Sequence, residues 1–269
     1  MTTKTIDLVI ARYNENLDWL KAYEKYNFNK IYVYNKGTSP IRLPDPFHSK
    51  AIYEDLENVG RCDHTYIHHI IKNYNKLGDV SFFIKGSTIC PDRGAQREPE
   101  KFDAIIEKIF KTGDSYFIGK DYKQNIGELM GNFTMSYYMA HCKQNVNSTT
   151  KVELFPANPR PFSEWYKKHF SNLKAPETRG SFAGIFAVSK THIQQRKKED
   201  YMPILQDLAA HSNPEAGHFM ERAWLALFYP IPPECFNGTT NLQGGKRKTY
   251  KKRRAKKGKR KVRRSGCAK

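Results

Sequence analysis

The chain has 269 residues, of which 39% are hydrophobic and 13% aromatic, so it can bury a substantial core. It contains no apolar run near the ~20 residues of a membrane helix, and its start lacks the apolar region of a signal peptide. We therefore expect a soluble intracellular protein. Its 5 cysteines include no C-x-x-C pair, which argues against a disulfide framework and a cysteine zinc site.

The formal net charge of +19 is concentrated at the C-terminal end. Residues 246–269 contain 15 Lys or Arg and no Asp or Glu, which leaves 31 basic and 27 acidic residues, a net charge of +4, in residues 1–245. A segment so charged and so poor in apolar residues cannot bury enough surface to fold alone. We expect a globular domain over residues 1–240 and a disordered basic tail over 241–269, suited to non-specific polyanion binding or nuclear targeting.

The start of the chain predicts a strand, a loop, a helix near residues 18–20 and a second strand. Two apolar runs, 6–11 and 30–34, each end abruptly in polar residues. In open α/β sheets, ligands bind beyond the carboxyl ends of the strands. The candidates for binding a nucleotide there are Arg12, Tyr13, Asn14, Asn35 and Lys36. The alternative is a set of polar loops such as any α/β protein has.

Apolar periodicity predicts further helices and strands along the chain. Strands are expected at residues 80–84, 115–119 and 181–189, the last with a central glycine. Helices are expected at residues 63–74, 102–110, 190–196, 202–210 and 214–228. Short buried apolar runs that alternate with helices indicate an α/β fold with a mostly parallel central sheet flanked by helices.

Residues 58–61, with the sequence Asn-Val-Gly-Arg, stand just before the helix predicted at 63–74. Backbone N–H groups at a helix start bind phosphate, and glycine permits a close approach of the ligand. Asn58, Gly60 and Arg61 are therefore candidate phosphate-binding residues, because a planar guanidinium matches phosphate oxygens. The alternative is a turn with a capping Asn58 and a surface Arg61.

Two histidines of the same predicted helix, His64 and His68, are four residues apart, which places both imidazoles on one helical face. Zinc sites use such a spacing, but the sequence has no H-E-x-x-H motif. We favour structural histidines with hydrogen-bonding partners over a metal site.

A resemblance rests on five short blocks taken in their order and spacing. They are residues 11–15 with Trp19, 34–37, 58–61 with Tyr66, Leu77 with 82–86, and 217–224. Together these blocks resemble an uncharacterised, glycosyltransferase-like family known from fungi and large DNA viruses. The resemblance covers most of residues 6–230 and implies a GT-A-like, Rossmann-like α/β fold that transfers a sugar from a nucleotide-diphosphate donor.

The basic tail also resembles the Lys/Arg-rich C-termini of large-DNA-virus proteins. This second resemblance implies a virus-encoded protein in the host cytoplasm, with nuclear or virion association through the tail.

Metal-dependent members of this fold class usually carry an Asp-x-Asp pair after a central strand, where it holds a divalent ion on the diphosphate. This sequence contains no Asp-x-Asp, and Lys85 and Gly86 follow the strand predicted at 80–84. Lysine is a compact point charge, so we expect Lys85 to supply the positive charge on the diphosphate. Mn²⁺ or Mg²⁺ stays an open alternative.

The segment 217–224, with the sequence Gly-His-Phe-Met-Glu-Arg-Ala-Trp, holds the strongest catalytic candidates. His218, Glu221 and Arg222 have helical spacings of three and four residues, so they share one face. An inverting sugar transfer needs a base that deprotonates the acceptor hydroxyl, and Glu221 is favoured over His218 for that role. The alternative is an ion-pair network on the helix surface.

The sequence thus predicts a glycosyltransferase that acts on a hydroxyl of a glycan or glycoprotein. Arg61, Lys85 and Arg222 are the cations expected to stabilise the leaving diphosphate. Two alternatives stay open: a nucleic-acid-associated protein that acts through its basic tail, and a catalytically inactive module that binds nucleotide sugars.

Overall fold

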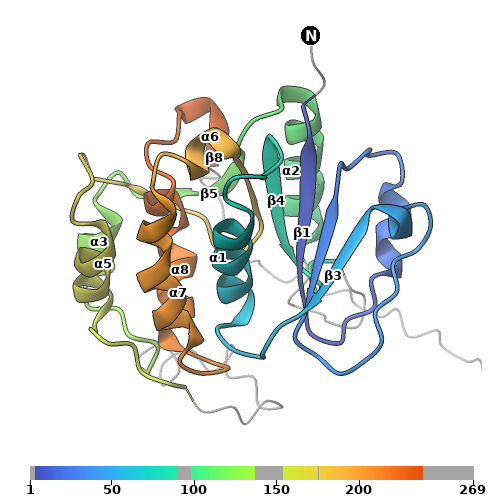
Figure 1. Cartoon of the computed structure of the whole chain (residues 1–269). Helices are drawn as coiled ribbons and strands as arrows, with labels where there is room; N and C mark the ends of the chain where they lie inside the picture. Colours follow the sequence, from blue (N-terminus) through green and yellow to red (C-terminus); the bar gives the residue numbers. More distant parts are fainter. Residues whose placement is uncertain (1–3, 90–97, 137–153, 175, 239–269) are drawn as a thin grey trace, which may run out of the picture.

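A computed structural model describes residues 4–89, 98–136, 154–174 and 176–238, and a five-stranded sheet forms its centre (Figure 1). The strands are β1 Ile6–Arg12, β2 Ile31–Asn35, β3 Ala51–Asp55, β4 Val80–Lys85 and β7 Phe186–Ser189. Their order in the sheet is β3-β2-β1-β4-β7. The first four run parallel, and β7 is antiparallel to β4. The predicted α/β fold with a mostly parallel central sheet is confirmed.

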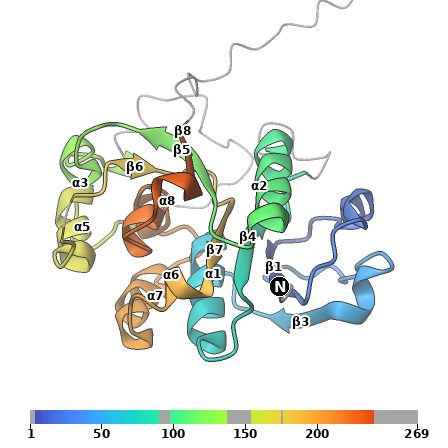
Figure 2. The ribbon, with the colours of Figure 1, turned by 90° about the horizontal axis from the view of Figure 1, so that it is seen from above.

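Helices cover both faces of this sheet, and Figure 2 shows α1 and α2 on opposite sides of it. The α-helices are α1 Arg61–Asn73, α2 Pro99–Thr112, α3 Ile126–Leu129, α5 Phe162–Phe170, α6 Lys190–Ile193, α7 Met202–Ala209 and α8 Glu215–Leu227. The 3₁₀ segments within the described residues are η1 Asp18–Tyr23, η2 Phe47–Lys50, η5 Lys198–Tyr201 and η6 Pro233–Cys235.

The two faces of the central strands belong to two hydrophobic clusters. Val9 and Phe83 point to the side of α1, α5, α7 and α8, whereas Leu8 and Phe82 point to the side of α2. Successive side chains of a strand alternate between faces, so a strand covered on both sides reads as one continuous apolar run. This is why β1, β2 and β4 were predictable from their composition.

A smaller sheet of three strands joins distant parts of the chain. It has the order β6-β5-β8, with β5 Phe117–Asp121, β6 Arg179–Gly180 and β8 Phe236–Gly238. β5 pairs antiparallel with β6 and parallel with β8. The strand expected at residues 115–119 therefore exists, shifted by two residues.

The strand predicted over 181–189 is wrong in its first half. Only Phe186–Ser189 is a strand, and the chain turns before it, because Ala183 has a φ of 72° and Gly184 a φ of 62°. These left-handed angles are incompatible with an extended strand. Tyr66 Oη donates a hydrogen bond to the Gly184 carbonyl at 2.8 Å, so tertiary contacts hold this turn.

No strand was predicted at β3, the edge strand of the sheet. Its Ile52 and Tyr53 are 42% and 38% exposed, so it lacks the continuous burial that marks β1 and β2. The helix expected near residues 18–20 is the short 3₁₀ segment η1.

Within the described residues, no helix is both long and apolar enough to cross a membrane. The basic tail predicted at 241–269 lies outside the described residues.

Candidate active site

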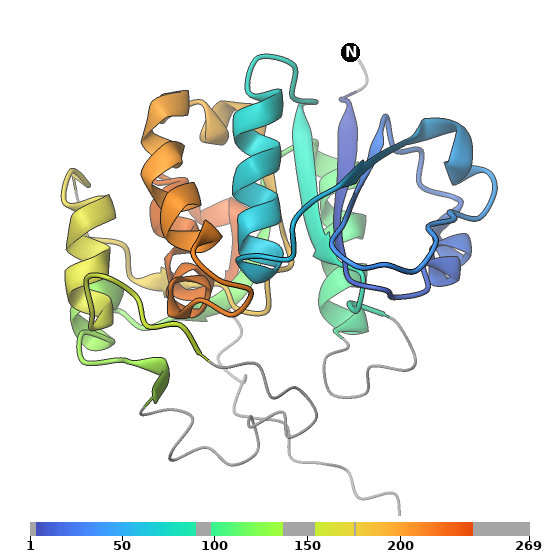
Figure 3. The ribbon, with the colours of Figure 1, turned by 60° about the horizontal axis from the view of Figure 1, so that its bottom comes forward.

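Three elements meet where β4 ends and where α1 and α8 begin, and Figure 3 turns this edge of the molecule toward the viewer. An Nη atom of Arg61, at the start of α1, lies 2.9 Å from His218 Nε2 in α8. Gly217 packs against the same turn: a Cβ on it would lie 3.6 Å from Asp63 Oδ2 and 3.8 Å from Arg61 Cδ. The fold therefore brings together residues about 150 positions apart, at the carboxyl edge of the parallel strands.

The carboxylate of Glu221 is surrounded by cationic groups. Its side chain is 26% exposed, and its Oε2 lies 3.9 Å from His218 Nδ1. Burial by itself raises the pKa of Glu221, but the charges of Arg61, Arg222 and Lys85 hold the pKa below its usual value. Glu221 is therefore ionised at neutral pH and able to accept a proton or to attract a cation.

His218 is neutral, and its ring forms a hydrogen bond with Arg61. Burial, followed by the charge of Arg61, lowers the pKa of His218 to about 4. A guanidinium only donates hydrogen bonds, so Nε2 of His218 accepts from Arg61 and its proton is on Nδ1. Because the free lone pair of the ring is used in this bond, the geometry favours Glu221 over His218 as the base.

Arg222 is held in place on α8 by its own helix and by aromatic rings. An Nη atom donates to the His218 carbonyl at 2.6 Å. The centre of the guanidinium lies 3.8 Å from the ring centroid of Phe133 and 5.6 Å from that of Phe182. These rings stabilise a fixed positive charge beside Glu221.

Asp63 is a second carboxyl group at this place, and sequence reasoning missed it. It is 1% exposed, and it accepts hydrogen bonds from Trp224 Nε1 at 3.2 Å and from Cys62 Sγ at 3.7 Å. Burial and the charge of Glu221 raise the pKa of Asp63 to about 7, against the opposing effect of Arg61. Two carboxyl groups whose pKa values are pushed apart are typical of acid–base sites.

Two lysines add positive charge to this site. Lys85 ends β4 in a turn that the Thr88 N–H closes by donating to the Lys85 carbonyl at 3.0 Å. Lys101, in the first turn of α2, donates from Nζ to the Phe182 carbonyl and lies 3.4 Å from Ser181 Oγ. Burial lowers the pKa of Lys101 to about 8, with Lys85 and Glu221 among the charges that act on it.

Sequence reasoning also missed Lys101. Lys101 stands one residue before the helix predicted at 102–110, and nothing in the local sequence shows which side of that helix meets the sheet edge. The site thus comprises seven residues: Arg61, Asp63, Lys85, Lys101, His218, Glu221 and Arg222. We refer to them below as the Glu221 cluster.

Three residues predicted to bind a nucleotide form contacts within the protein. Arg12 is 4% exposed and donates to Asn35 Oδ1 at 2.6 Å and to the carbonyls of Ser39 and Pro40 at 3.0 Å. Asn14 Oδ1 accepts from Ser39 N and Ser39 Oγ, both at 2.8 Å. These contacts favour a structural role, in which the residues hold the loop that follows β2 onto the end of β1.

Lys36 and Gly60 shape the approach to α1. Lys36 Nζ donates to the carbonyls of Val59 and Arg61, the latter at 2.6 Å, and burial lowers its pKa to about 8. Gly60 has a φ of 61°, and its N–H donates to the His211 carbonyl at 2.8 Å. The Gly60 N–H is therefore occupied, which weakens the prediction that it binds phosphate.

Asn58 and Tyr13 lie at the surface. Asn58 is exposed, and the residue that precedes the first turn of α1 is Gly60, so Asn58 does not cap this helix. Tyr13, at the end of β1, is 49% exposed.

The two histidines spaced on α1 have different surroundings. His68 Nε2 lies 3.0 Å from Glu54 Oε1, whereas His64 Nδ1 is buried and has no hydrogen-bond partner in the described part of the chain. Burial lowers the pKa of His64 to about 3, so it is neutral. Over the same residues, no group of three or more His, Cys, Asp or Glu side chains could hold a metal ion.

The family comparison matches the C-terminal part of the chain. Residues 130–241 match a family described as a protein of unknown function (DUF3431). This range includes α8 with His218, Glu221 and Arg222, but neither the parallel strands nor the start of α1. Among curated proteins, no match is found.

Proposed function

We propose that the protein is a glycosyltransferase that moves a sugar from a nucleotide-diphosphate donor to a hydroxyl group of a glycan or glycoprotein. The observation that carries this proposal is the ionised Glu221 carboxylate among Arg61, Lys85, Lys101 and Arg222 at the carboxyl edge of a parallel sheet. A base beside a group of cations suits a reaction in which a hydroxyl attacks and an anionic group leaves.

In the proposed step, the acceptor oxygen attacks the anomeric carbon of the donor sugar while Glu221 takes the proton of that hydroxyl. The bond between the anomeric carbon and the diphosphate oxygen breaks, and its electron pair leaves with the nucleoside diphosphate. Arg61 and Lys85 stabilise the negative charge that develops on this leaving group. A single displacement of this kind inverts the anomeric centre.

The charges of the Glu221 cluster decide whether it can bind a divalent metal ion. Its carboxyl groups are Asp63 and Glu221. The positive charges of the nearby Arg61 and Lys85 disfavour a metal ion bound between these two carboxyl groups. Lys85 and Lys101 supply positive charge that Mn²⁺ or Mg²⁺ otherwise brings to a diphosphate. We therefore propose that transfer proceeds without added metal.

The test measures release of nucleoside diphosphate from a panel of nucleotide sugars by the full chain, with a glycoprotein acceptor and with either Mn²⁺ or EDTA. We expect release from at least one donor, and Glu221→Gln should reduce the rate about 100-fold or more because the base is lost. The rate in EDTA should be comparable to the rate in Mn²⁺.

Glu164→Gln is the matched control, since Glu164 is an exposed residue of α5 that pairs with Lys167 at 2.9 Å. This variant should retain the full rate. Calorimetry with the same donors distinguishes the alternatives: binding without release supports an inactive nucleotide-sugar-binding module, and absence of binding to every donor contradicts the proposal.

A further inference from the structure

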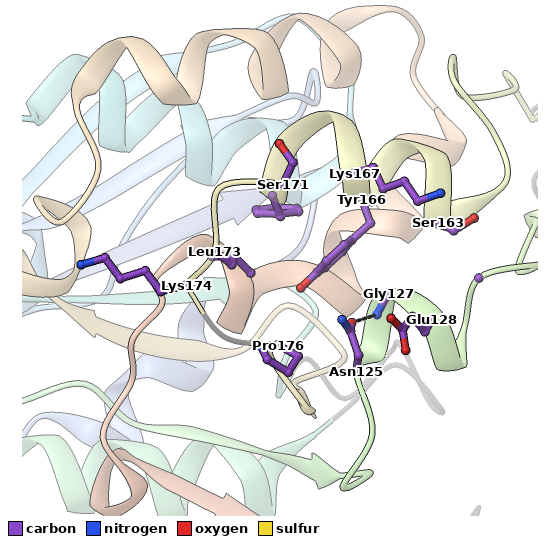
Figure 4. A pocket seen from close by; sticks show the side chains of 12 residues that line it. Asn125, Gly127, Glu128, Ser163, Tyr166, Lys167, Ser171, Leu173, Lys174 and Pro176 are labelled. Atoms are coloured by element: carbon purple, nitrogen blue, oxygen red, sulfur yellow. Dashed lines mark hydrogen bonds between the residues drawn. The ribbon is translucent and has the colours of Figure 1, made fainter.

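A second site lies between α3 and α5, where the structure has a cavity of about 860 Å³ (Figure 4). None of the residues that line it belongs to the Glu221 cluster. Its walls include Asn125 and Gly127 at the start of α3, Tyr166 of α5, and the turn that contains Leu173. A volume of this size accommodates a molecule of several rings.

The Tyr166 hydroxyl is an unexplained polar group in this cavity. Tyr166 is 7% exposed, and within the described residues its buried hydroxyl has no hydrogen-bond partner. Figure 4 shows the hydroxyl directed toward the part of the cavity near Asn125 and Pro176. Buried hydroxyl groups in proteins nearly always have a partner, so this one points to a molecule that enters the cavity.

The ring of Tyr166 cannot easily turn away to find another partner. It packs on the backbone of α3 so closely that a Cβ on Gly127 would lie 2.6 Å from Tyr166 Cδ1. On its other sides it contacts Phe162 and Phe170, with ring centroids 5.5 Å and 4.9 Å away. The direction of the hydroxyl is therefore fixed by packing.

The lining combines uncharged polar groups with apolar surface and has no dominant charge. The polar groups are Asn125, Ser163, Ser171 and Tyr166, the apolar ones Phe170, Leu173 and Pro176, and the charged ones Glu128, Lys167 and Lys174. Amide and hydroxyl groups both donate and accept hydrogen bonds, as the hydroxyl groups of a sugar do. Apolar side chains suit the C–H faces of sugar rings, whereas an alkyl chain would leave the Tyr166 hydroxyl without a partner.

We infer that this cavity is a binding site for a neutral oligosaccharide, separate from the Glu221 cluster. The Tyr166 hydroxyl bonds a sugar hydroxyl, and Phe170 and Leu173 contact the ring faces. This inference stands whether or not the protein transfers sugars, because it rests on a different set of residues.

The test is saturation-transfer NMR of the full chain with cellotetraose, maltotetraose, mannotetraose and chitotetraose, followed by titration of the sugar that binds. We expect at least one to bind, and Tyr166→Phe should weaken its binding about five- to tenfold through loss of one hydrogen bond. The control is Tyr53→Phe, which removes a hydroxyl on the distant edge strand β3 and should leave binding unchanged.

A second variant keeps the test independent of one side chain. Ser171→Gln enlarges an exposed residue that lines the cavity, and it should also weaken binding. Tyr166→Phe removes only a hydroxyl without a protein partner, so its melting temperature should not fall. Absence of binding by all four sugars, equal binding by both pocket variants and the unmodified chain, or binding of laurate in place of sugars would overturn the inference.

Discussion

Asp63 and Glu221 show how the surroundings of a residue, more than its type, decide what it does. Both are carboxyl groups of the Glu221 cluster, but their pKa values shift in opposite directions. Asp63 is buried against Trp224, and its side-chain hydrogen-bond donors in the described part of the chain, Trp224 and Cys62, are uncharged, whereas several cations surround Glu221. At neutral pH Glu221 is thus ready to accept a proton, while Asp63 is partly protonated.

Because the pKa of Asp63 is raised, we predict that the free energy of unfolding depends on pH. The pKa of Asp63 rises from 3.8 to about 7 on folding, through burial and the charge of Glu221. Between these values the folded state binds more protons than the unfolded state, so rising pH lowers the free energy of unfolding. Asp63→Asn removes this titration. Relative to the unmodified chain, the free energy of unfolding of this variant should rise by about 4 kcal/mol between pH 4 and pH 8, measured by urea unfolding.

Asp79→Asn is the control, and its effect on the free energy of unfolding should change with pH in the opposite direction. Hydrogen bonds from Thr5 lower the pKa of the Asp79 carboxyl, so its ionised form stabilises the folded state. This variant should lose stability relative to the unmodified chain as the pH rises through 4. If the curve of Asp63→Asn runs parallel to that of the unmodified chain at all pH values, the proposed burial of a protonated Asp63 is wrong.

Part of the candidate site was predictable at the level of single residues. Arg61 precedes a predicted helix, Lys85 follows a predicted strand, and His218, Glu221 and Arg222 share a helical face. The structure brings all of them together. Asp63 and Lys101 were not predictable, because each stands inside a helix whose orientation depends on tertiary packing. Arg12 and Asn35 have the sequence position of ligand-binding residues, but their partners in the protein come from a loop that no local pattern places.

At the scale of elements, the start of α1 is fixed by two close contacts. Gly60 lies against α7, where a Cβ would be 2.5 Å from the Leu208 carbonyl oxygen, and Gly217 brings α8 close to Asp63. Arg61 follows Gly60 with a φ of 54°, so two successive residues are left-handed where the loop enters the helix. The direction of the Arg61 side chain toward His218 depends on this turn.

These two glycines should respond differently to alanine. Gly60→Ala forces a Cβ to within 2.4 Å of His64 Cβ at a φ of 61°, so we expect a loss of about 2–4 kcal/mol in the free energy of unfolding. Gly217→Ala adds a methyl group at ordinary contact distances inside a helix, where alanine is favoured over glycine by about 1 kcal/mol. The second variant should therefore be as stable as the unmodified chain or more stable.

Urea unfolding of both variants measures this difference. A destabilised Gly217→Ala would show that α8 lies closer to α1 than described. An unaffected Gly60→Ala would contradict the left-handed turn before α1.

Some helices and strands were predicted from the sequence more accurately than others, and the differences have physical reasons. Helices α1, α2, α7 and α8 have a clear apolar stripe, and their predicted limits are close to the observed ones. The run at 181–189 is apolar throughout, but its first part is buried in a turn and not in a strand, and composition cannot distinguish these two kinds of burial. Edge strand β3 is exposed on both sides, and its apolar run of Ala51, Ile52 and Tyr53 is too short to mark a strand.

At the scale of the whole molecule, the topology of the sheet creates the site. Parallel strands place their carboxyl ends at one edge, and α1 begins at this edge and carries the chain back to the opposite edge, where β4 starts. The antiparallel β7 is the exception, and it carries the turn at 182–184 to the same edge, where the Phe182 carbonyl accepts a hydrogen bond from Lys101. The sequence indicates the parallel core, because buried runs alternate with helices, but it gives no signal for the reversed strand.

Overall charge complicates any test for an anionic ligand, since the chain has a net charge of +19 and 15 of its basic residues lie in 246–269. Pyrophosphate binding alone would not show which charges are responsible. A ligand that binds the folded and unfolded states equally leaves the melting temperature unchanged, so thermal shift detects only sites that folding creates. The Glu221 cluster is such a site, because it joins residues from four separate segments of the chain.

We therefore predict that pyrophosphate at about ten times its Kd raises the melting temperature of the full chain, by an amount that corresponds to about 1.4 kcal/mol. Lys85→Gln should remove most of this shift, whereas Lys251→Gln should retain it although both changes remove one positive charge. The shift should also decrease as NaCl is raised, because salt screens exposed charges. If Lys85→Gln keeps the full shift, the assignment of the diphosphate to the Glu221 cluster is wrong.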